Sequence, residues 1–408
     1  MFDLSRFINE HVTKRNGSMF RDDIIRYESE LTDAISDRSV LVIGGAGSIG
    51  SSFIKAILPY RPSELYIVDT NENALTELTR DLRSDGIFVP DIYLSYPMDY
   101  SSVTFKRMFE MHTRSNGKQG FDIVANFSAH KHVRSEKDIY SVEALLRNNV
   151  INAGGLLKLL EEYPPMTYFC VSTDKAANPV NIMGASKRIM EDLIFAYSDK
   201  FPVKTARFAN VAFSNGSLPA GFLERIKKRQ PLSAPSDVKR YFVSPEESGQ
   251  ICMLASMLGG NREIFYPKLK EAQMMTFDAI ALELLKAYGY EAKLCESDEE
   301  AINYAKDHLS SGEKLYPVHF SASDTSGEKA FEEFYTEGES IDTARFTSLG
   351  VIKDKPAPER EAVKRLITEL DRAFEKSGVT KGDIVSIIAS YLPNFEHIET
   401  GRSLDGKM

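Results

Sequence analysis

The sequence predicts an α/β fold with a doubly wound parallel sheet, a smaller α/β region in the C-terminal half and a helical tail. Three features indicate this fold. An apolar, β-branched run from Val40 to Ile43 leads through a glycine-rich turn into an amphipathic helix. Further apolar runs of strand length follow, and segments with helical periodicity separate them. Such alternation is typical of a parallel sheet that helices cover on both faces.

Each later element can be placed from its own pattern. Strands are expected at residues 64–69, 91–99, 121–129, 167–173 and 204–213. The clearest helices between them are expected at Glu143–Glu162 and Ser186–Ser198. Towards the C-terminus, residues 271–292 have an amphipathic helical pattern, residues 296–312 are acidic and polar, and two helical patterns follow Pro358.

Length and composition limit the possible functions. A chain of 408 residues with 42% apolar residues can form a folded protein of about two or three domains. Its 50 basic and 59 acidic residues give a net charge of -9, which would repel nucleic acid and anionic lipid. The charged N-terminal segment has neither the apolar core of a signal peptide nor a membrane span. Three scattered cysteines favour a reducing compartment, so a cytoplasmic protein is expected.

The turn "GGAGSIG" at residues 44–50 indicates a dinucleotide-binding site of the Rossmann type. Gly44 permits the tight turn, Gly47 lets the backbone approach a pyrophosphate, and Gly50 allows the helix to pack closely on the strand. Ser48 and Ile49, at the start of the helix, would offer backbone N–H groups to the anion.

A carboxylate stands where such a fold binds the ribose hydroxyls of the cofactor. Asp69 ends the run "ELYIVD" 19 residues beyond Gly50, close to the expected spacing of about 20 residues. It would pair with a free 2′-hydroxyl and repel a phosphate, so NAD is expected rather than NADP, although Arg80 or Arg83 would soften that preference. Asp99, at the end of the next run, is either an acceptor for the adenine amino group or a surface carboxylate at a strand end.

Further segments, in order over roughly residues 38–268, resemble the extended short-chain dehydrogenase/reductases. Besides the glycine turn they are "NFSAHKHV" at 126–133, "VSTDKAANPVNIMGASKR" at 171–188, "RFANVAFSNGS" at 207–217 and "RYFVSPEES" at 240–248. More narrowly, they are similar to the UDP-N-acetylglucosamine 4,6-dehydratases of bacterial polysaccharide and glycoprotein biosynthesis. The resemblance implies an NAD-dependent lyase that acts on a nucleotide sugar and forms a homo-oligomer.

The implied reaction assigns roles to one segment. Such a dehydratase moves hydride from carbon 4 of the sugar to NAD, eliminates water across carbons 5 and 6, and returns the hydride to carbon 6. It needs an acceptor for the carbon 4 hydroxyl proton, a base at carbon 5 and an acid at carbon 6. By resemblance, Asp174 is the acid, Lys175 is the base or its close helper, and Thr173 supplies a hydroxyl near carbon 4. They follow an expected strand, at the sheet edge that carries catalytic groups in open α/β sheets.

One position departs from the most familiar pattern. A large family of nicotinamide enzymes has a tyrosine four residues before a lysine, but this chain has Met183 four residues before Lys187. By resemblance, Lys187 binds the nicotinamide ribose and stabilises an alkoxide at carbon 4, while Met183 only packs against nicotinamide or sugar. The carbon 4 proton must then pass through Thr173, Asp174, Lys175 or a water.

The other motifs are expected to line the nicotinamide and the substrate. Ser128 and Ala129 would lie on the nicotinamide side, and Lys131 would reach the sugar or the pyrophosphate. His130 and His132 flank this lysine, but no third ligand is apparent, so no metal is expected.

By resemblance, Asn210 and the turn around Ser214 hold the sugar and the first phosphate. Asn215 stands where many relatives have an arginine. Arg240 is expected to bind the pyrophosphate, because a guanidinium can hold phosphate oxygens in a bidentate fork.

The motifs divide the chain into four parts. These are a helical N-terminal extension at 1–37, an NAD-binding domain at 38–210 with interleaved later segments, a nucleotide-sugar-binding region at 211–345 and a helical C-terminal extension at 346–408. The last part is expected to pack on the sugar-binding region or to mediate oligomerisation.

Two other functions stay open. A nucleotide-sugar 4-epimerase needs only reversible oxidation at carbon 4, and the Asp174–Lys175 pair argues against it. A non-catalytic protein that senses NAD or a nucleotide sugar would fit the missing tyrosine.

Overall fold

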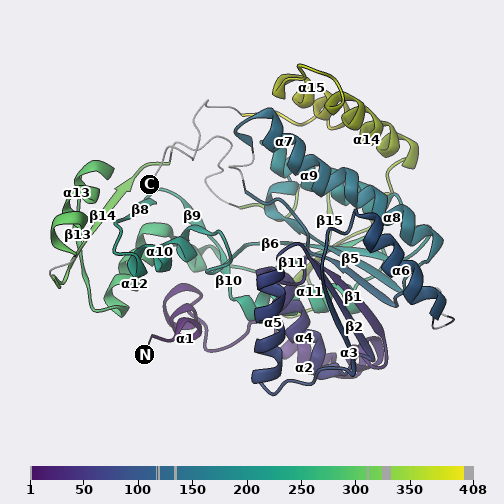
Figure 1. The fold of residues 1–408 in the computed structure, drawn as a ribbon, viewed down its shortest axis with the longest axis horizontal. Coiled ribbons are helices and arrows are strands. Elements are labelled where there is room, and N and C mark those ends of the chain that lie inside the picture. The colour runs from purple at the N-terminus through teal and green to yellow at the C-terminus, as the bar shows by residue number, and fades with distance from the viewer. Residues whose placement is uncertain are drawn as a thin grey trace.

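The computed structural model describes residues 2–115, 117, 120–132, 136–309, 312–323 and 332–398. Its centre is a nine-stranded sheet in the order β15-β16-β11-β6-β5-β4-β1-β2-β3 (Figure 1). From one edge to the other these strands are β15 (Ser340–Asp342), β16 (Leu349–Lys353), β11 (Glu263–Pro267), β6 (Val203–Phe208), β5 (Thr167–Thr173), β4 (Ile123–Asn126), β1 (Ser39–Ile43), β2 (Glu64–Asp69) and β3 (Ile92–Pro97). Neighbours from β11 to β3 are parallel, whereas β16 pairs antiparallel with both β11 and β15 and is therefore the strand of this sheet that runs in the opposite direction. The predicted doubly wound α/β fold is confirmed.

Strand β1 shows how one sheet builds two cores. Val40 and Val42 face one helical layer, whereas Leu41 and Ile43 face the other, because successive side chains on a strand point to opposite faces. The first layer contains α4 (Ser48–Ile57), α5 (Glu72–Ser84) and α11 (Pro245–Leu258), and the second contains α6 (Val103–Ser115), α8 (Asn152–Glu162) and α9 (Ile182–Phe195). Both faces of the sheet are therefore buried, as the continuous apolar runs predict.

The helix expected at Glu143–Glu162 is interrupted. The chain forms α7 (Ile139–Leu146), then a π-helical turn η4 (Arg147–Ile151), and only then α8. The π turn places Asn149 where its side chain bonds the loop after β4. This tertiary contact leaves no mark on the helical periodicity, so the sequence could not predict the interruption.

Helix α9 begins earlier than its periodicity predicts. The helix starts at Ile182 rather than Ser186, because the Asn181 side chain accepts a hydrogen bond from the Gly184 backbone and caps the helix.

The N-terminal extension divides between two cores. Helices α2 (Arg21–Arg26) and α3 (Glu28–Ile35) contact each other, and α3, which carries the buried Leu31, lies beside α11. The first helix, α1 (Leu4–Phe7), and the π-helical turn η1 (Ile8–Val12) bury their apolar residues in a separate lobe.

That smaller lobe lies on the left in Figure 1. Its sheet has the order β13-β14-β8, and short strand pairs join β10 to β7 and β12 to β9. The strands are β7 (Asn210–Val211), β8 (Leu232–Pro235), β9 (Lys239–Arg240), β10 (Phe242–Val243), β12 (Met275–Thr276), β13 (Glu291–Leu294) and β14 (Leu315–Ser321), and the helices are α10 (Leu218–Lys227), α12 (Phe277–Ala287) and α13 (Asp298–His308). Helix α12 occupies only the middle of the pattern at 271–292, and the acidic stretch 296–312 contains α13.

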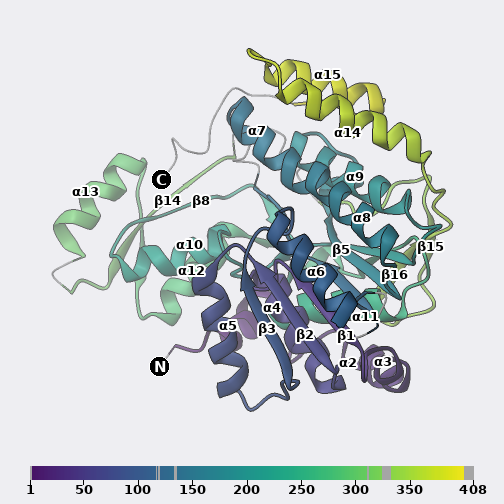
Figure 2. The ribbon, with the colours of Figure 1, turned by 45° about the vertical axis from the view of Figure 1, so that its right-hand side comes forward.

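The C-terminal extension packs on the main domain. Its helices, α14 (Arg360–Phe374) and α15 (Lys381–Tyr391), lie over α7 and α9 in both ribbon views (Figures 1 and 2). Leu366, Leu370 and Ile388 share an apolar cluster with residues of those two helices. The described residues of this extension bury their apolar face against α7 and α9 and not against the sugar-binding region, contrary to the first expectation, and its other expected role, in oligomerisation, stays a prediction.

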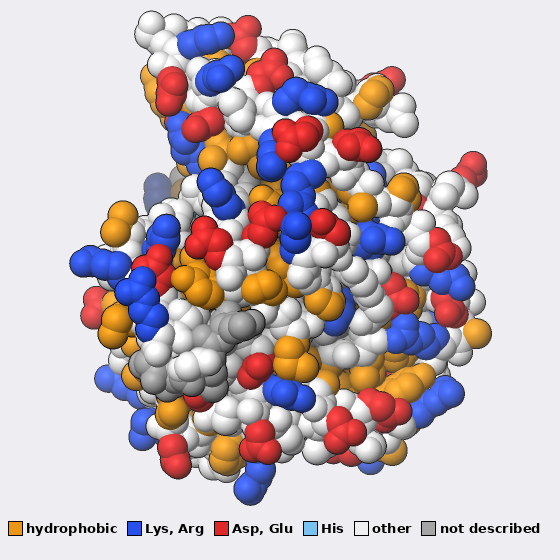
Figure 3. Space-filling view, turned by 90° about the vertical axis from the view of Figure 1, so that its right-hand side faces the viewer, with side chains coloured by type: hydrophobic (Ala, Val, Ile, Leu, Met, Phe, Trp, Pro, Cys, Tyr) orange, Lys and Arg blue, Asp and Glu red, His pale blue; other side chains and the backbone are white. Residues whose placement is uncertain are grey.

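The surface carries charges of both signs. On the face in Figure 3, Lys and Arg side chains alternate with Asp and Glu side chains. Within the described ranges, no helix combines the length and the apolar character that a membrane crossing requires.

Candidate active site

The glycine turn connects β1 to α4, and three of its four glycines meet different constraints. Gly44 has φ +71°, and a Cβ atom there would lie 2.6 Å from the Ser128 backbone nitrogen. A Cβ atom at Gly50 would lie 2.4 Å from the Gly44 oxygen, whereas one at Gly47 would come no closer than 3.4 Å to any atom. The fold itself thus requires Gly44 and Gly50, while the surface at Gly47 stays open to a ligand.

Both candidate adenosine contacts also have structural partners. Asp69 accepts hydrogen bonds from the Ala46 backbone at 3.0 Å and from the Asn71 backbone at 2.9 Å. Because each carboxylate oxygen has two lone pairs, Asp69 keeps the capacity to accept from a ribose hydroxyl. Asp99 is exposed, and it accepts from the backbone and the hydroxyl of Ser101.

The catalytic segment follows β5. Thr173 ends the strand, and Asp174 and Lys175 form the 3-10 turn η5 (Asp174–Ala176). The Thr173 hydroxyl donates to Asp174 Oδ1 at 2.6 Å, and the Lys175 ammonium donates to both Asp174 oxygens at 3.2 Å. Asp174 is only 6% exposed. A hydroxyl, a carboxylate and an amine are therefore linked at the carboxyl end of the sheet, the edge that carries ligand sites in open α/β folds.

Lys187 and Met183 lie on α9 in different surroundings. The Lys187 Nζ donates to the Val171 carbonyl of β5 at 3.1 Å, and burial lowers the pKa of this lysine to about 8. Met183 is 3% exposed and belongs to an apolar cluster with Val142 of α7 and Leu366 of α14. Its neighbours in this cluster are protein side chains that cannot transfer a proton.

Glu136 holds the beginning of α9. Its carboxylate accepts hydrogen bonds from the Ile182 and Met183 backbones at 3.1 and 2.9 Å. The C-terminal extension reaches the same residue, because Lys381 Nζ donates to the Glu136 carbonyl at 2.7 Å and His397 Nε2 lies 3.4 Å from its carboxylate. The extension thus contacts the helix that carries Met183 and Lys187.

The loop after β4 is tied to the π turn. The Ser128 hydroxyl donates to Asn148 Oδ1 at 3.1 Å, and Asn149 exchanges two hydrogen bonds with the His130 backbone. Asn149 also donates to the Ser186 hydroxyl on α9. These contacts place the candidate nicotinamide-side loop next to the helix of Lys187.

The rest of that loop faces the turn at 214–217. Ala129 is half-buried and Lys131 is exposed. A Cβ atom at Gly216, where φ is +74°, would lie 2.9 Å from the His132 ring. Val133, the last residue of the expected motif, lies outside the described residues. The loop and the turn are therefore in close contact.

The turn at 214–217 also contacts the glycine turn. Ser214 is buried, and the Asn215 backbone donates to the Ser48 hydroxyl at 2.9 Å. Ser48 and Ile49 are half-buried in the first turn of α4. A turn expected to hold the substrate is thus bonded directly to the glycine turn.

Asn210 and Arg240 meet at a residue that no motif indicated. Asn210 Nδ2 donates to Glu332 Oε1 at 2.8 Å, and the Tyr241 backbone donates to Glu332 Oε2 at 3.0 Å. Arg240 is 5% exposed, and its charge and those of the Asp174–Lys175 pair act on Glu332. The candidate substrate contacts and the catalytic segment therefore converge on one buried carboxyl group.

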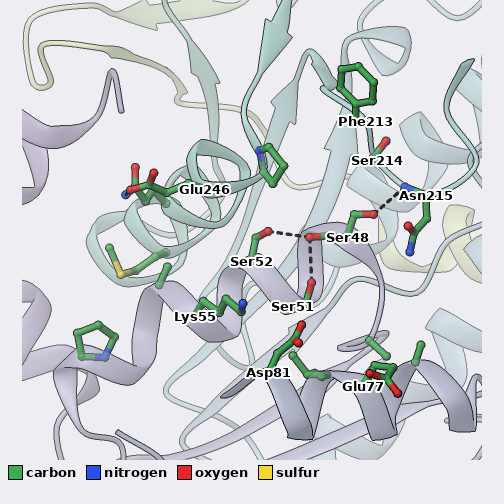
Figure 4. Close-up of a pocket in the computed structure, with 18 of the residues that line it drawn as sticks. Ser48, Ser51, Ser52, Lys55, Glu77, Asp81, Phe213, Ser214, Asn215 and Glu246 are labelled. Atoms are coloured by element: carbon green, nitrogen blue, oxygen red, sulfur yellow. Dashed lines mark hydrogen bonds between the residues drawn. The ribbon is translucent and has the colours of Figure 1, made fainter. Parts of the chain in front are cut away.

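A cavity of about 750 Å³ lies beside the glycine turn (Figure 4). It is lined by Ser48, Ser51, Ser52 and Lys55 of α4, by residues of α5 and α11, and by Phe213, Ser214 and Asn215. The Ser51 and Ser52 hydroxyls donate to the Ser48 carbonyl, so they already have partners. Residues 173–175 and Lys187 do not line this cavity, so it is distinct from the catalytic segment. Within the described ranges, no group of three or more His, Cys, Asp or Glu residues is placed to hold a metal ion.

Sequence reasoning missed Glu332, Asn149 and Glu136. Glu332 lies in "TSGEKAFEEFYTEGE", a segment similar to the C-terminal part of the dehydratase family, of which residues 325–331 lie outside the described residues. The asparagines at 148–149 are visible in the sequence as polar residues, but nothing in the helical pattern indicates their contact with the loop after β4. Nothing in the sequence around Glu136 indicates its role.

The chain is similar in sequence to several curated proteins. A Methanocaldococcus jannaschii protein named as an uncharacterized membrane protein is 32% identical over 64% of this chain and 76% of its own length. The probable polysaccharide biosynthesis protein EpsC of Bacillus subtilis is 26% identical over 86% of this chain but 56% of its own length, so the chain spans about half of that relative. A UDP-N-acetylglucosamine 4,6-dehydratase (inverting) of Campylobacter jejuni is 24% identical over 74% of this chain and 84% of its own length.

Solved structures share the fold at low identity. Pen from Bacillus thuringiensis has a TM-score of 0.61 and 19% identity, over 83% of this chain and 98% of that one. The dTDP-glucose 4,6-dehydratase DesIV from Streptomyces venezuelae, solved with NAD, has a TM-score of 0.53 and 18% identity, over 72% and 87%. A UDP-glucose 4-epimerase from Thermotoga maritima has a TM-score of 0.51 and 18% identity, over 73% and 90%. The dehydratase and the epimerase are equally similar, so these structures identify the extended short-chain dehydrogenase/reductase fold and no single reaction.

A match to a family model shows the family to which the chain belongs. The model described as polysaccharide biosynthesis protein matches residues 40–349, which include the glycine turn, the catalytic segment and the small lobe. This match covers more than half of the chain, and it contains Asp69, Lys187, Asn210 and Arg240. The chain therefore belongs to the polysaccharide biosynthesis protein family, on the fold of the extended short-chain dehydrogenase/reductases.

Proposed function

We propose that the chain is an NAD-dependent nucleotide-sugar 4,6-dehydratase that converts UDP-N-acetylglucosamine to a 4-keto-6-deoxy sugar nucleotide. The observation that carries the proposal is the hydrogen-bonded segment Thr173–Asp174–Lys175 at the end of β5. A dehydratase needs a proton acceptor at carbon 4, an acid at carbon 6 and a base at carbon 5, and this segment offers a group for each task.

The residues at the glycine turn fit NAD. The open surface at Gly47 admits a pyrophosphate, and Asp69 at the end of β2 would accept from the ribose hydroxyls. Lys187 would bind the nicotinamide ribose. When bound, NAD supplies the acceptor for the carbon 4 hydride and its return to carbon 6.

The carbon 4 hydroxyl proton has a route that does not involve Met183. The Thr173 Oγ1 takes this proton while it passes its own proton to Asp174 Oδ1, its hydrogen-bond acceptor. The O–H bonds at carbon 4 and at Thr173 break, and new O–H bonds form at Thr173 and Asp174. Asp174 then gives its proton to the carbon 6 hydroxyl, which leaves as water, and the carboxylate is restored.

Lys175 is suited to the carbon 5 proton. Protonation of Asp174 removes the negative charge that stabilises the Lys175 ammonium, and the partly exposed lysine can release a proton to solvent. The neutral amine would take the carbon 5 proton and later return it to carbon 5, and a proton from solvent then restores the Lys175 ammonium. Protonation of Asp174 and deprotonation of Lys175 are thus linked in this mechanism.

The runner-up is a nucleotide-sugar 4-epimerase, which shares the fold and the cofactor. It requires no acid for carbon 6, so the Asp174–Lys175 pair would have no task in it. This pair is the reason to prefer the dehydratase.

A panel of nucleotide sugars tests the proposal. The purified protein is incubated with uridine and guanosine diphosphate sugars, with and without an N-acetyl group, and the products are read by mass spectrometry and proton NMR. We expect UDP-N-acetylglucosamine to lose one water and to give a 4-keto-6-deoxy product. A product of unchanged mass with an inverted carbon 4 would identify an epimerase, and no product from any sugar would identify a binding protein.

A further inference from the structure

Strand β5 and helix α9 are joined by two hydrogen bonds beside the catalytic segment. The Lys187 Nζ donates to the Val171 carbonyl at 3.1 Å. One helical turn further along α9, Glu191 Oε1 accepts from the Ser172 hydroxyl at 2.7 Å. Val171 and Ser172 directly precede Thr173, the last residue of the strand. The two bonds therefore set how the helix that carries Lys187 lies against the strand that ends at Thr173.

A buried guanidinium holds Glu191 in place. Arg207 of β6 donates through Nε to Glu191 Oε1 at 2.8 Å and through Nη2 to Glu191 Oε2 at 2.7 Å, and both residues are 0% exposed. The same guanidinium donates to the Phe334 carbonyl at 3.0 Å and to the two Glu339 oxygens at 2.9 and 3.1 Å. Two parallel bonds from one guanidinium fix the orientation of a carboxylate as well as its position. Glu191 is thus a fixed acceptor to which the end of β5 is attached.

The contact that precedes this bond along β5 has a different character. Cys170 faces the same helical layer as Ser172, because alternate side chains of a strand share a face, and its sulfur lies 3.5 Å from the Met190 sulfur. Apolar packing of this kind is not directional, so it does not determine the rotation or the sliding of α9 over β5. The bond between Ser172 and Glu191 supplies that direction next to the catalytic segment.

We propose that Ser172 and Glu191 are positioning residues that align Thr173 with Lys187 at carbon 4 of the sugar. The inference rests on the proposed function, in which Thr173 takes the carbon 4 hydroxyl proton and Lys187 stabilises the alkoxide that forms. Both groups must then face the same oxygen atom. A misplacement of about 1 Å can slow such a step about 10²-fold, so the bond that joins the strand to the helix controls the rate of carbon 4 oxidation.

Ser172→Ala removes the link and leaves its acceptor satisfied, because Glu191 Oε1 still accepts from Arg207 Nε. The NAD-loaded protein, in saturating excess over UDP-N-acetylglucosamine, is followed through a single turnover. We expect the rate constant for consumption of the sugar to fall about 10- to 100-fold, and the slower step to be sensitive to deuterium at carbon 4. A loss of folded protein alone would lower the amplitude of the turnover and leave its rate constant unchanged.

Thr205→Val is the matched control. The buried Thr205 hydroxyl of β6 donates to the Cys170 carbonyl at 2.7 Å, so it also bonds β5 but does not connect it to α9. Valine keeps the volume and removes this hydrogen bond. We expect the wild-type rate constant in Thr205→Val, even where the melting temperature falls.

Two further variants test the bond itself. Ser172→Thr keeps the hydroxyl, so it should keep more of the rate constant than Ser172→Ala. Glu191→Asp keeps the charge beside Arg207, but its shorter side chain cannot reach both Arg207 and Ser172, so it should also slow the step. The double variant of Ser172→Ala and Glu191→Asp should be no slower than the slower single variant, because both changes break one bond.

A wild-type rate constant in Ser172→Ala, equal slowing in Thr205→Val, or additive losses in the double variant would overturn the inference. An epimer as the wild-type product would refute the proposed function alone, since epimerisation also removes hydride from carbon 4 and the same rate constants still decide the role of Ser172. The absence of any product from every nucleotide sugar would refute both.

Discussion

The glycine turn and the catalytic segment lie at the same edge of the sheet, but different forces fix them. Backbone contacts fix the turn, since an added Cβ at Gly44 or Gly50 would meet backbone atoms within 3.0 Å. Charged and polar side chains fix the catalytic segment, where Asp174 bonds Thr173 and Lys175. Steric fit therefore shapes the cofactor half, and electrostatics shape the catalytic half.

This difference teaches that binding and chemistry should respond to different substitutions. Added atoms should disturb the turn, because it is close-packed backbone. Changed charges should disturb the catalytic segment, because its groups act through protons and fields rather than through volume. Variants of the catalytic segment that keep volume and change charge should thus reduce turnover and leave NAD binding intact.

The largest expected effect is the loss of the acid or the base. Asp174→Asn and Lys175→Ala should each lower turnover by about 10²–10⁴-fold, the usual contribution of a positioned acid or base. Hydride removal from carbon 4 should partly survive in at least one variant and give transient NADH absorbance without dehydrated product. NAD affinity by calorimetry should stay close to the wild type. Near wild-type dehydration in both variants would refute the assigned mechanism.

Lys187→Ala should lower both turnover and NAD affinity, because this residue is proposed to act in both halves of the site. This residue lies on α9 beside β5, and its proposed tasks are to bind the nicotinamide ribose and to stabilise the carbon 4 alkoxide. We expect a loss of turnover of about 10²–10³-fold, as for other removed oxyanion partners, together with weaker NAD binding. Unchanged NAD affinity in calorimetry would place Lys187 in the catalytic half alone.

Two glycine variants should separate folding from binding within the turn. Gly50→Ala should lower the free energy of unfolding by about 1–3 kcal/mol, because its Cβ would overlap the Gly44 oxygen. Gly47→Ala should leave thermal unfolding unchanged but weaken NAD binding about tenfold, since the methyl group occupies only the open surface. Equal melting temperatures for both variants would show that packing does not constrain the turn at Gly50.

The cofactor half should also discriminate between dinucleotides. Because Asp69 would meet a 2′-phosphate with a negative charge, NAD should bind at least about tenfold more tightly than NADP, a difference of about 1.4 kcal/mol. Calorimetry with both dinucleotides measures this ratio, and Asp69→Asn should reduce it. Equal affinities in the wild type would remove Asp69 from the ribose site.

The two halves also differ in how well the sequence predicts them. The cofactor half could be predicted, because residues 40–69 contain the strand, the turn and the carboxylate in one contiguous motif whose spacing follows from sterics. The places of Thr173 and Asp174 could be predicted in a similar way, since Thr173 ends a strand and Asp174 follows it, while their roles stay a prediction.

The partners of the catalytic segment could not be predicted. Glu332 lies 158 residues beyond Asp174, and no periodicity indicates that it bonds Asn210 and the Tyr241 backbone. Asn149 depends on a π turn that tertiary hydrogen bonds create, and Glu136 depends on its contact with α9. Charged clusters assembled from several segments are thus visible only when the fold is known.

The smallest expected effect is at Met183. It is buried in an apolar cluster with Val142 and Leu146, so Met183→Leu, which is similar in volume, should cost less than about 1.5 kcal/mol and keep most of the activity. Met183→Tyr should lower turnover further, because the larger side chain would crowd that cluster. Its hydroxyl would also be buried among apolar side chains that cannot form a hydrogen bond with it. Turnover should therefore rank wild type close to Met183→Leu, then Met183→Tyr, then Lys187→Ala. A collapse of turnover in Met183→Leu, with melting temperature and NAD affinity unchanged, would show that the sulfur takes part in the reaction and that the proton route through Thr173 is incomplete.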